Sequence, residues 1–287
     1  MAGTTQPPVG IPLLFVTDLD GTLLNSSGEI SAADLEALKR VNGLGCGIVA
    51  ATGRPCRLIP GCVKNLPGLD YIISANGAVV YDCSTGNEIL TNYLDRSAAL
   101  AIYEETAGRG GGVDLYFTGP YIAEDRSREL LGRFMHFSDE ALAEGAKVFT
   151  TVHSARPYLL SDTEPLIKEV CVFESRRECG VVLRELRRQG HVTAVTLLGY
   201  EIEVTSRNAT KGNALAFIRR LRGIEKTRVM AIGDNENDLS MRAEAGFFIA
   251  MGNAGGPVKA AADYISASVD SGGVAQAIDR LLFSSVV

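Results

Sequence analysis

Short apolar runs that end at polar or glycine residues constrain the fold of this chain more than any other feature. Residues 13–17 (LLFVT) form one such run and residues 46–51 (CGIVAA) another, and a helical pattern that follows Ser31 separates them. Uninterrupted apolar runs of this length are typical of strands that are buried on both faces of a parallel sheet. The order strand, helix, strand therefore predicts an α/β unit with right-handed crossovers.

The same pattern returns further along the chain. Residues 71–74, 229–232 and 247–250 are short apolar runs, and residues 215–221 have the spacing of a helix that is apolar on one face. Together these segments predict an open parallel sheet. In such a sheet, ligand sites lie beyond the carboxyl ends of the strands.

Residues 84–205 show a different pattern. Helical patterns occupy residues 98–107 and 179–189. Four further segments alternate polar and apolar residues, as half-exposed antiparallel strands do, and they are residues 112–117, 168–173, 192–198 and 201–205. The predicted fold class is therefore α/β. A Rossmann-like parallel-sheet core is expected from residues 1–83 and 206–287, with an α+β domain inserted at residues 84–205.

Composition disfavours several classes of partner. Lys and Arg total 28 against 34 for Asp and Glu, a formal charge of −6, so we expect no binding to nucleic acid or to anionic membranes. The first residues lack the basic and apolar segments of a secretory leader, which indicates a cytoplasmic protein. Neither the six cysteines nor His136, His153 and His191 show zinc-ligand spacing, so we expect reduced thiols and no transition-metal site.

The strongest chemical signal follows the first predicted strand. Asp18 and Asp20 lie two residues apart there, directly before Gly21. Two carboxylates at this spacing on a strand end point to the same side, where their repulsion has to be offset by a cation or a shared proton. The alternative interpretation is an acidic turn in which Gly21 supplies the bend.

A second acidic cluster follows the apolar run at residues 229–232. It contains Asp234, Glu236 and Asp238, and such a cluster is costly in a crevice unless a hard cation binds it. Ligands that offer only oxygen atoms suit Mg²⁺. The alternative is a helix N-terminus, whose dipole favours acidic residues and would account for Glu236 and Asp238 better than for Asp234.

Polar residues suited to a phosphoryl group lie at two further element ends. Thr52, Gly53 and Arg54 follow the second strand, and Lys211 opens the later helix. A hydroxyl, backbone amides at a helix start and an ammonium group are what the oxygens of a phosphoryl group need around them. Taken singly, Thr52 also fits a helix cap and Lys211 a solvated surface charge, but their places at element ends favour one shared site.

Six motifs occur in order along the chain. They are DLDGTLL from Asp18, ATGRP from Ala51, NGA from Asn76, KGNAL from Lys211, GDNENDLSM from Gly233 and MGNA from Met251. These motifs resemble those of the haloacid dehalogenase (HAD) superfamily, in particular its Cof-type sugar-phosphatase branch of subfamily IIB. The resemblance covers the whole predicted core, and the inserted domain lies where that branch carries its larger α/β cap.

The resemblance implies a phosphatase that hydrolyses small phosphorylated metabolites, with sugar phosphates as the expected class. Asp18 would be the nucleophile that forms an aspartyl-phosphate. Asp20 would protonate the leaving group and then take a proton from the attacking water. Thr52 and Lys211 would stabilise the transferring phosphoryl group, and the cap would close over the site and supply specificity.

The same resemblance implies a Mg²⁺ cofactor. Its ligands would be the side chains of Asp18 and Asp234 and the backbone carbonyl of Asp20, with Asp238 supporting the metal site from the second layer. Substrate contacts are expected from Gly53, Arg54, Asn76, Asn237 and Asn253. Arg54 also fits an ion pair at a helix start, and Asn76 and Asn253 also fit turns.

Two alternatives stay open from the residues alone. A phosphomutase of the phosphomannomutase type shares the DxDGT nucleophile and would return the phosphoryl group to a second hydroxyl, but KGNAL and GDNENDLSM are closer to the phosphatases. A non-catalytic phospho-accepting sensor module similar to response-regulator receivers would have no use for an acid at Asp20. As partners we expect a small phosphomonoester substrate, with the chain a monomer or a weak homodimer.

Overall fold

A computed structural model describes residues 12–134, 147–161, 163–196 and 198–283. The chain divides into two compact units, which we call unit 1 (Met1–Leu90 and Thr210–Val287) and unit 2 (Thr91–Ala209). Both borders fall a few residues after the expected ones at 83/84 and 205/206. The reason is that the strand Glu88–Thr91 extends the unit 1 sheet and the strand Glu201–Ser206 lies within the unit 2 sheet.

Some expectations fall on residues outside the described ranges. These are His136, the N-terminal residues on which the absence of a leader was judged, and residue 197 in the expected strand 192–198. None of the helices in the described ranges combines the length and apolar character that a membrane crossing requires. All six cysteines lie in the described ranges, and none of them forms a disulfide there.

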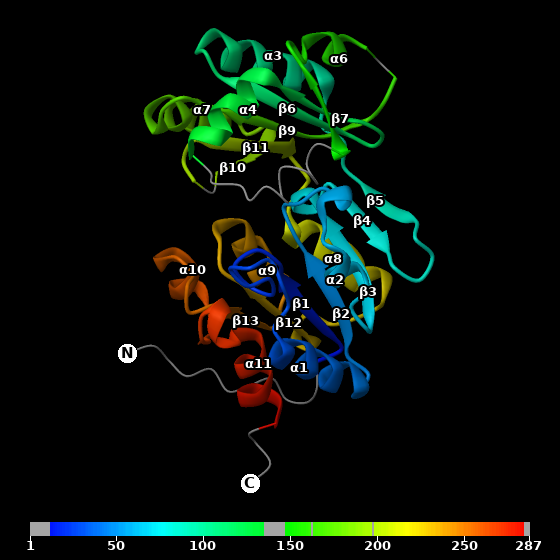
Figure 1. Cartoon of the computed structure of the whole chain (residues 1–287). Helices are drawn as coiled ribbons and strands as arrows, with labels where there is room; N and C mark the ends of the chain where they lie inside the picture. The colour runs from blue at the N-terminus through cyan, green and yellow to red at the C-terminus, as the bar shows by residue number, and fades with distance from the viewer. Residues whose placement is uncertain (1–11, 135–146, 162, 197, 284–287) are drawn as a thin grey trace. The chain divides into compact units, whose positions relative to one another are not determined.

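In the described ranges, unit 1 forms an eight-stranded sheet in the order β14-β13-β12-β1-β2-β3-β4-β5 (Figure 1). From β14 to β3 every neighbouring pair is parallel, and β4 pairs with β3 in the antiparallel sense. The strands are β1 (Leu14–Asp18), β2 (Gly47–Ala51), β3 (Leu69–Ser74), β4 (Val79–Asp82), β5 (Glu88–Thr91), β12 (Val229–Gly233), β13 (Phe247–Ala250) and β14 (Tyr264–Ile265). The parallel α/β core predicted from the apolar runs is confirmed.

The sequence pattern predicted two of the helices of unit 1, the one that begins after Ser31 and the one that begins at Lys211. The helices of unit 1 are α1 (Ala32–Gly43), α2 (Gly61–Lys64), α8 (Lys211–Leu221), α9 (Leu239–Arg242), α10 (Gly256–Ala261) and α11 (Gly273–Ile278). Ser31 caps α1 by accepting a hydrogen bond from the Asp34 amide, and Thr210 caps α8 in the same way. Helix α1 packs against α11 and α8 against α9. Strands β1, β2, β12 and β13 are buried along their whole length, which explains their continuous apolar pattern.

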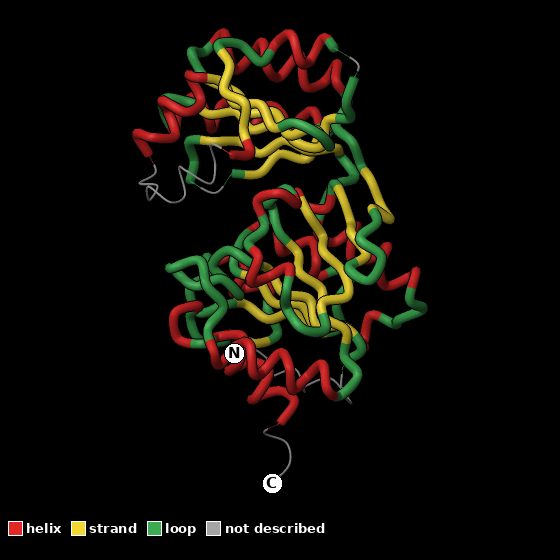
Figure 2. The backbone as a smooth tube through the Cα atoms, turned by 45° about the vertical axis from the view of Figure 1, so that its right-hand side comes forward, coloured by secondary structure: helices red, strands yellow, loops and turns green. Residues whose placement is uncertain are grey.

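Unit 2 is an α+β unit whose described residues form a six-stranded sheet in the order β10-β11-β9-β6-β7-β8. Its strands are β6 (Gly112–Phe117), β7 (Tyr121–Glu124), β8 (Phe149–Val152), β9 (Leu166–Val172), β10 (Val192–Val195) and β11 (Glu201–Ser206). Its helices are α3 (Arg96–Gly108), α4 (Asp125–Phe134), α6 (Arg156–Leu160) and α7 (Arg176–Gln189). All strand pairs are antiparallel except β7 with β8. Figure 2 shows helices packed against the strand layer in each unit.

The expectation that the strands of unit 2 are half exposed is wrong for its two central strands. Every residue of β6 and β9 is buried, whereas β10 alternates between buried and half-buried residues as expected. Two of the polar residues that suggested a solvated face are paired instead. Asp114 of β6 bonds to α4, and Lys168 of β9 bonds to Glu203 of β11. A paired polar residue can be buried, so alternation by itself does not imply exposure.

Candidate active site

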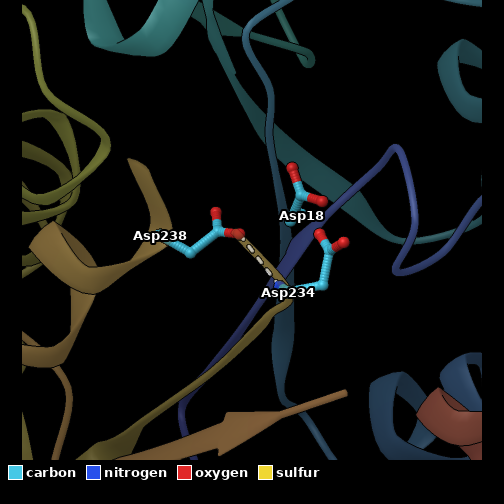
Figure 3. Close-up of side chains that lie close together, drawn as sticks. All are labelled: Asp18, Asp234 and Asp238. Carbon is cyan, nitrogen blue, oxygen red and sulfur yellow. Dashed lines mark hydrogen bonds between the residues drawn. The ribbon is translucent and has the colours of Figure 1, made fainter. Parts of the chain in front are cut away.

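Two neighbouring strands of unit 1 carry acidic residues to the same edge of the sheet. Strand β1 ends at Asp18, and its parallel neighbour β12 ends at Gly233, directly before Asp234. Asp238 joins them from the turn Glu236–Asp238. One carboxylate oxygen from each of Asp18, Asp234 and Asp238 lies within 4.8 Å of the others, and Figure 3 shows the three side chains gathered at this edge. Two segments far apart in the sequence therefore form one acidic cluster.

A single lysine lies within this cluster. Lys211, the first residue of α8, has a fully buried side chain whose Nζ donates to Oδ1 of Asp18 and to Oδ1 of Asp238, each at 2.6 Å. Burial alone would lower the pKa of the Lys211 ammonium, but the two carboxylates outweigh burial and raise its pKa above the ordinary value. Lys211 is therefore a permanent cation, not a solvated surface charge.

The negative charge of the three carboxylates exceeds the positive charge of Lys211. Burial raises the pKa of Asp18 well above its usual range and repulsion from Asp238 adds to this, although Lys211 opposes both effects. Burial, again with repulsion from Asp238, raises the pKa of Asp234 to about 6. When its three acids are ionised, the cluster carries more negative charge than Lys211 neutralises, and a set of carboxylate oxygens at this spacing fits Mg²⁺.

Asp238 also holds the loop that carries Asp234. Its Oδ2 accepts the backbone amides of Asp234 and Asn235, each at 3.0 Å, and the side chain is fully buried. Gly233 makes this approach possible, because a Cβ there would lie 2.4 Å from the Asp238 carboxyl carbon. With one oxygen on Lys211 and the other on the backbone, Asp238 positions both the lysine and Asp234.

Two residues orient the Asp234 carboxylate, and only one of them was expected at the site. The Thr22 hydroxyl donates to Oδ1 of Asp234 at 3.4 Å, a contact that sequence reasoning missed although Thr22 belongs to the DLDGTLL motif. Asn253, predicted as a substrate contact, donates to Oδ2 of Asp234 at 3.3 Å and to the Gly21 carbonyl at 2.8 Å. Gly21 has a φ of +80°, and a Cβ there would lie 2.5 Å from Asp234, so only glycine fits.

Asp20 lies outside the three-acid cluster. Its carboxylate forms two hydrogen bonds with Arg54, from Nε to Oδ2 at 2.8 Å and from Nη2 to Oδ1 at 2.6 Å. Half of the Asp20 side chain is exposed. The structure thus places Arg54 on the second acid of the motif, and Arg54 forms an ion pair there.

The remaining expected residues line the same end of the sheet. Thr52 follows β2, is buried, and accepts the Arg54 amide at 3.0 Å, and Gly53 lies between these two residues. Asn237 donates from Nδ2 to Oδ1 of Asn76 at 2.9 Å, while its own buried Oδ1 has no hydrogen-bond partner among the described residues. Asn76 has a φ of +58°, the left-handed turn conformation that asparagine tolerates.

The sequence model of the haloacid dehalogenase-like hydrolases matches residues 15–278, a range that contains every residue of the site. The chain belongs to this family. The resemblance drawn from the six motifs is therefore confirmed. Phosphatase YwpJ of Bacillus subtilis is 30% identical to this HAD-like hydrolase over 290 residues, which cover 94% of this chain and 99% of YwpJ.

Two further comparisons agree with this assignment. The 5-amino-6-(5-phospho-D-ribitylamino)uracil phosphatase YwtE of Bacillus subtilis is 30% identical over 279 residues, which cover 92% of this chain and 96% of YwtE. A solved HAD-like hydrolase from B. subtilis superimposes with a TM-score of 0.82 at 27% identity and covers 94% of this chain and 100% of its own. The chain is accordingly a phosphatase of the HAD-like hydrolase family, and the sensor-module alternative is set aside.

Proposed function

We propose that this HAD-like hydrolase is a Mg²⁺-dependent phosphomonoesterase that releases phosphate from small metabolites through an aspartyl-phosphate on Asp18. The observation that carries the proposal is the cluster of Asp18, Asp234 and Asp238, in which the buried ammonium group of Lys211 bonds to Asp18 and Asp238. This excess of negative charge favours a divalent cation.

The contacts of the cluster indicate which residues would hold Mg²⁺. Asp238 has one oxygen on Lys211 and the other on backbone amides, so it suits a supporting role. Asp18 and Asp234 would bind the cation directly, together with the backbone carbonyl of Asp20. The bound ion would neutralise charge on the phosphoryl oxygens.

The chain's own residues supply the nucleophile and the proton transfers. Lys211 fixes one oxygen of Asp18, which leaves the other oxygen to bond to phosphorus as the bond to the leaving oxygen breaks. Asp20 donates a proton to that leaving oxygen. Water then attacks the phosphorus of the aspartyl-phosphate and Asp20 takes a proton from that water. The bond between phosphorus and the Asp18 oxygen breaks, inorganic phosphate is released and both aspartates return to their starting state.

The substrate class rests on the relatives and on the motifs. YwtE is named for a substrate with a phosphorylated ribityl chain, and the motifs resemble those of sugar phosphatases. We therefore infer that the physiological substrate is a phosphorylated sugar or polyol. Unit 2 would act as the cap that selects it.

A phosphate-release screen tests the proposal. Wild-type protein is assayed with p-nitrophenyl phosphate and with sugar, polyol and nucleotide monophosphates, in Mg²⁺ or in EDTA, and activity is expected only with Mg²⁺. Asp18→Asn should lower kcat by on the order of 10⁴ or more, because it removes the nucleophile while keeping the side-chain shape. A thermal unfolding curve like that of the wild-type protein should show that the Asp18→Asn variant is folded.

A matched control shows that the loss is specific to the site. Glu36→Gln removes an exposed carboxylate of α1 and should retain the wild-type rate. Full activity in EDTA, or an active Asp18→Asn protein, would contradict the proposal. Transfer of the phosphoryl group to a second hydroxyl in place of water would indicate a phosphomutase.

A further inference from the structure

Arg54 is held at both ends by the protein. Its backbone amide donates to the Thr52 hydroxyl at 3.0 Å, and its carbonyl accepts from the Ser74 hydroxyl at 2.9 Å and from the Ala75 amide at 3.0 Å. At the other end, Nη1 donates to the Leu58 carbonyl at 3.1 Å. These contacts hold the Arg54 side chain in one conformation, which begins at the end of β2.

In this conformation the guanidinium group contacts Asp20. Nε and Nη2 of Arg54 bond to the two carboxylate oxygens of Asp20, the paired geometry that a planar guanidinium forms with a carboxylate. Within the described residues, no other side chain forms a hydrogen bond with Asp20. The side chains are 38% and 50% exposed, and ion pairs so open to water contribute little to stability. The pair therefore orients Asp20 more than it stabilises the fold.

We propose that Arg54 is a positioning residue for Asp20 and does not serve as a ligand of the phosphoryl group. This inference rests on the proposed function, in which Asp20 exchanges a proton with the leaving oxygen and then with water. Protonation of Asp20 leaves one oxygen that accepts hydrogen bonds, so Arg54 gives up one of its two contacts: it keeps hold of that oxygen, while the protonated oxygen turns its O–H toward the leaving group. When Asp20 takes the proton of the water, the same state is regenerated.

The two roles of Arg54 predict different dependence on the leaving group. Proton donation matters for a sugar alkoxide, which is a strong base, and matters little for p-nitrophenolate, which leaves readily without a proton. A ligand of the phosphoryl group acts on the part that both substrates share. The loss caused by removing Arg54 therefore depends on the substrate only if Arg54 acts through Asp20.

The test measures kcat and KM of Arg54→Ala with a hexose 6-phosphate and with p-nitrophenyl phosphate in Mg²⁺. We expect kcat/KM to fall about 30-fold or more with the sugar phosphate and by no more than about threefold with p-nitrophenyl phosphate. The ratio kcat/KM reports the steps up to departure of the leaving group, so it leaves out the later hydrolysis of the aspartyl-phosphate, which is the same for both substrates and also uses Asp20. Asp20→Asn should show the same asymmetry. The double variant Asp20→Asn/Arg54→Ala should be no worse than Asp20→Asn alone, since the two residues act as one unit.

Two further variants complete the design. Arg54→Lys keeps the charge but not the paired geometry, so it should recover only part of the loss on the sugar phosphate. Arg57→Ala removes an exposed arginine of the same loop and should leave both substrates unaffected. Thermal unfolding of each variant shows whether it is folded.

Three results would overturn the inference. An equal fall in kcat/KM on both substrates would make Arg54 a phosphate ligand. Unchanged rates in folded Arg54→Ala would make the contact a surface ion pair only. A wild-type protein that releases no phosphate from either substrate would overturn the proposed function first, and the inference with it.

Discussion

Each unit of the molecule contains a cluster of buried charged side chains, and the two clusters differ in charge balance. In unit 1, three carboxylates lie together, and Lys211 bonds to two of them, Asp18 and Asp238. In unit 2, Asp114 accepts from the Ser127 hydroxyl at 2.6 Å and from Arg128 at 2.9 Å, and Lys168 bonds to Glu203 at 2.5 Å. The charges of this second cluster are thus matched one to one, and those of the unit 1 cluster are not.

The difference teaches how a functional cluster is distinguished from a structural one. A matched buried pair needs nothing from outside, although it contributes little net stability once the cost of removing both charges from water is counted. An unmatched cluster raises the pKa of its acids and is relieved by a cation that the chain does not supply. Burial of charged side chains does not by itself distinguish the two clusters, because both clusters contain buried charges.

The largest expected effect comes from removing the buried lysine of each cluster. Lys211→Ala should lower kcat with p-nitrophenyl phosphate by about 10² to 10³, the usual loss for one preorganised electrostatic donor. Lys168→Ala leaves Glu203 without its ion-pair partner, so it should lower the free energy of unfolding by roughly 3 kcal/mol while kcat changes little. Equal losses of kcat in the two variants would erase the distinction between the clusters.

A smaller effect concerns pH, because each cluster contains an acid with a raised pKa. Burial raises the pKa of Asp234 and of Asp114 to about 6 from the ordinary 3.8. Between these values the folded state keeps protons that the unfolded chain has lost. The contribution of these two acids to the free energy of unfolding of the metal-free protein therefore falls as pH rises from 3.8 to 6 and stays lower above 6.

Mg²⁺ should separate the two contributions. When Mg²⁺ binds the ionised Asp234, the free energy of unfolding at pH 7 should rise by on the order of 1 kcal/mol. The gain is small because Asp234 is partly exposed to water. Mg²⁺ should not change the contribution of Asp114. Urea unfolding at pH 4 and pH 7, in Mg²⁺ or EDTA, measures this. Asp234→Asn should lose most of the stabilisation by Mg²⁺, and Asp114→Asn should keep it. The reverse result would place the cation in unit 2.

The smallest effect concerns an acid that belongs to neither cluster. Glu169 of β9 is fully buried, burial raises its pKa well above the usual range, and neither carboxyl oxygen has a hydrogen-bond partner among the described residues. Glu169→Met removes these unpaired polar atoms, so it should raise the free energy of unfolding by about 1–2 kcal/mol and leave kcat unchanged. Glu169→Gln keeps polar atoms and should gain less. A loss of stability in Glu169→Met would show that the carboxyl group is paired after all.

Much of the core could be predicted because its signals are local. The run before Asp18 and the run before Asp234 each show a buried strand, and parallel strands bring their carboxyl ends together. Strands β4, β5, β7, β8 and β14 were not predicted, because none of them is longer than four residues. The burial of β6 and β9 was missed because a pattern of residue types does not show whether a polar side chain has a partner.

Within the site, residue types were easier to predict than contacts. Asp18, Asp234, Asp238 and Lys211 were expected at one site and lie together there, although their roles stay a proposal. The contact of Arg54 with Asp20 and that of Thr22 with Asp234 were not foreseen. Both depend on how the loops after neighbouring strands bend, and the residue types at those positions are compatible with several partners.

The sequence by itself determined where the strands end and that acids, a lysine and a hydroxyl stand at those ends, because apolar runs and motifs are properties of neighbouring residues. Only the tertiary structure decided which charges are matched and which are left in excess. That choice depends on distances of a few ångströms between side chains from distant segments, and those distances arise only when the sheet and its loops are assembled.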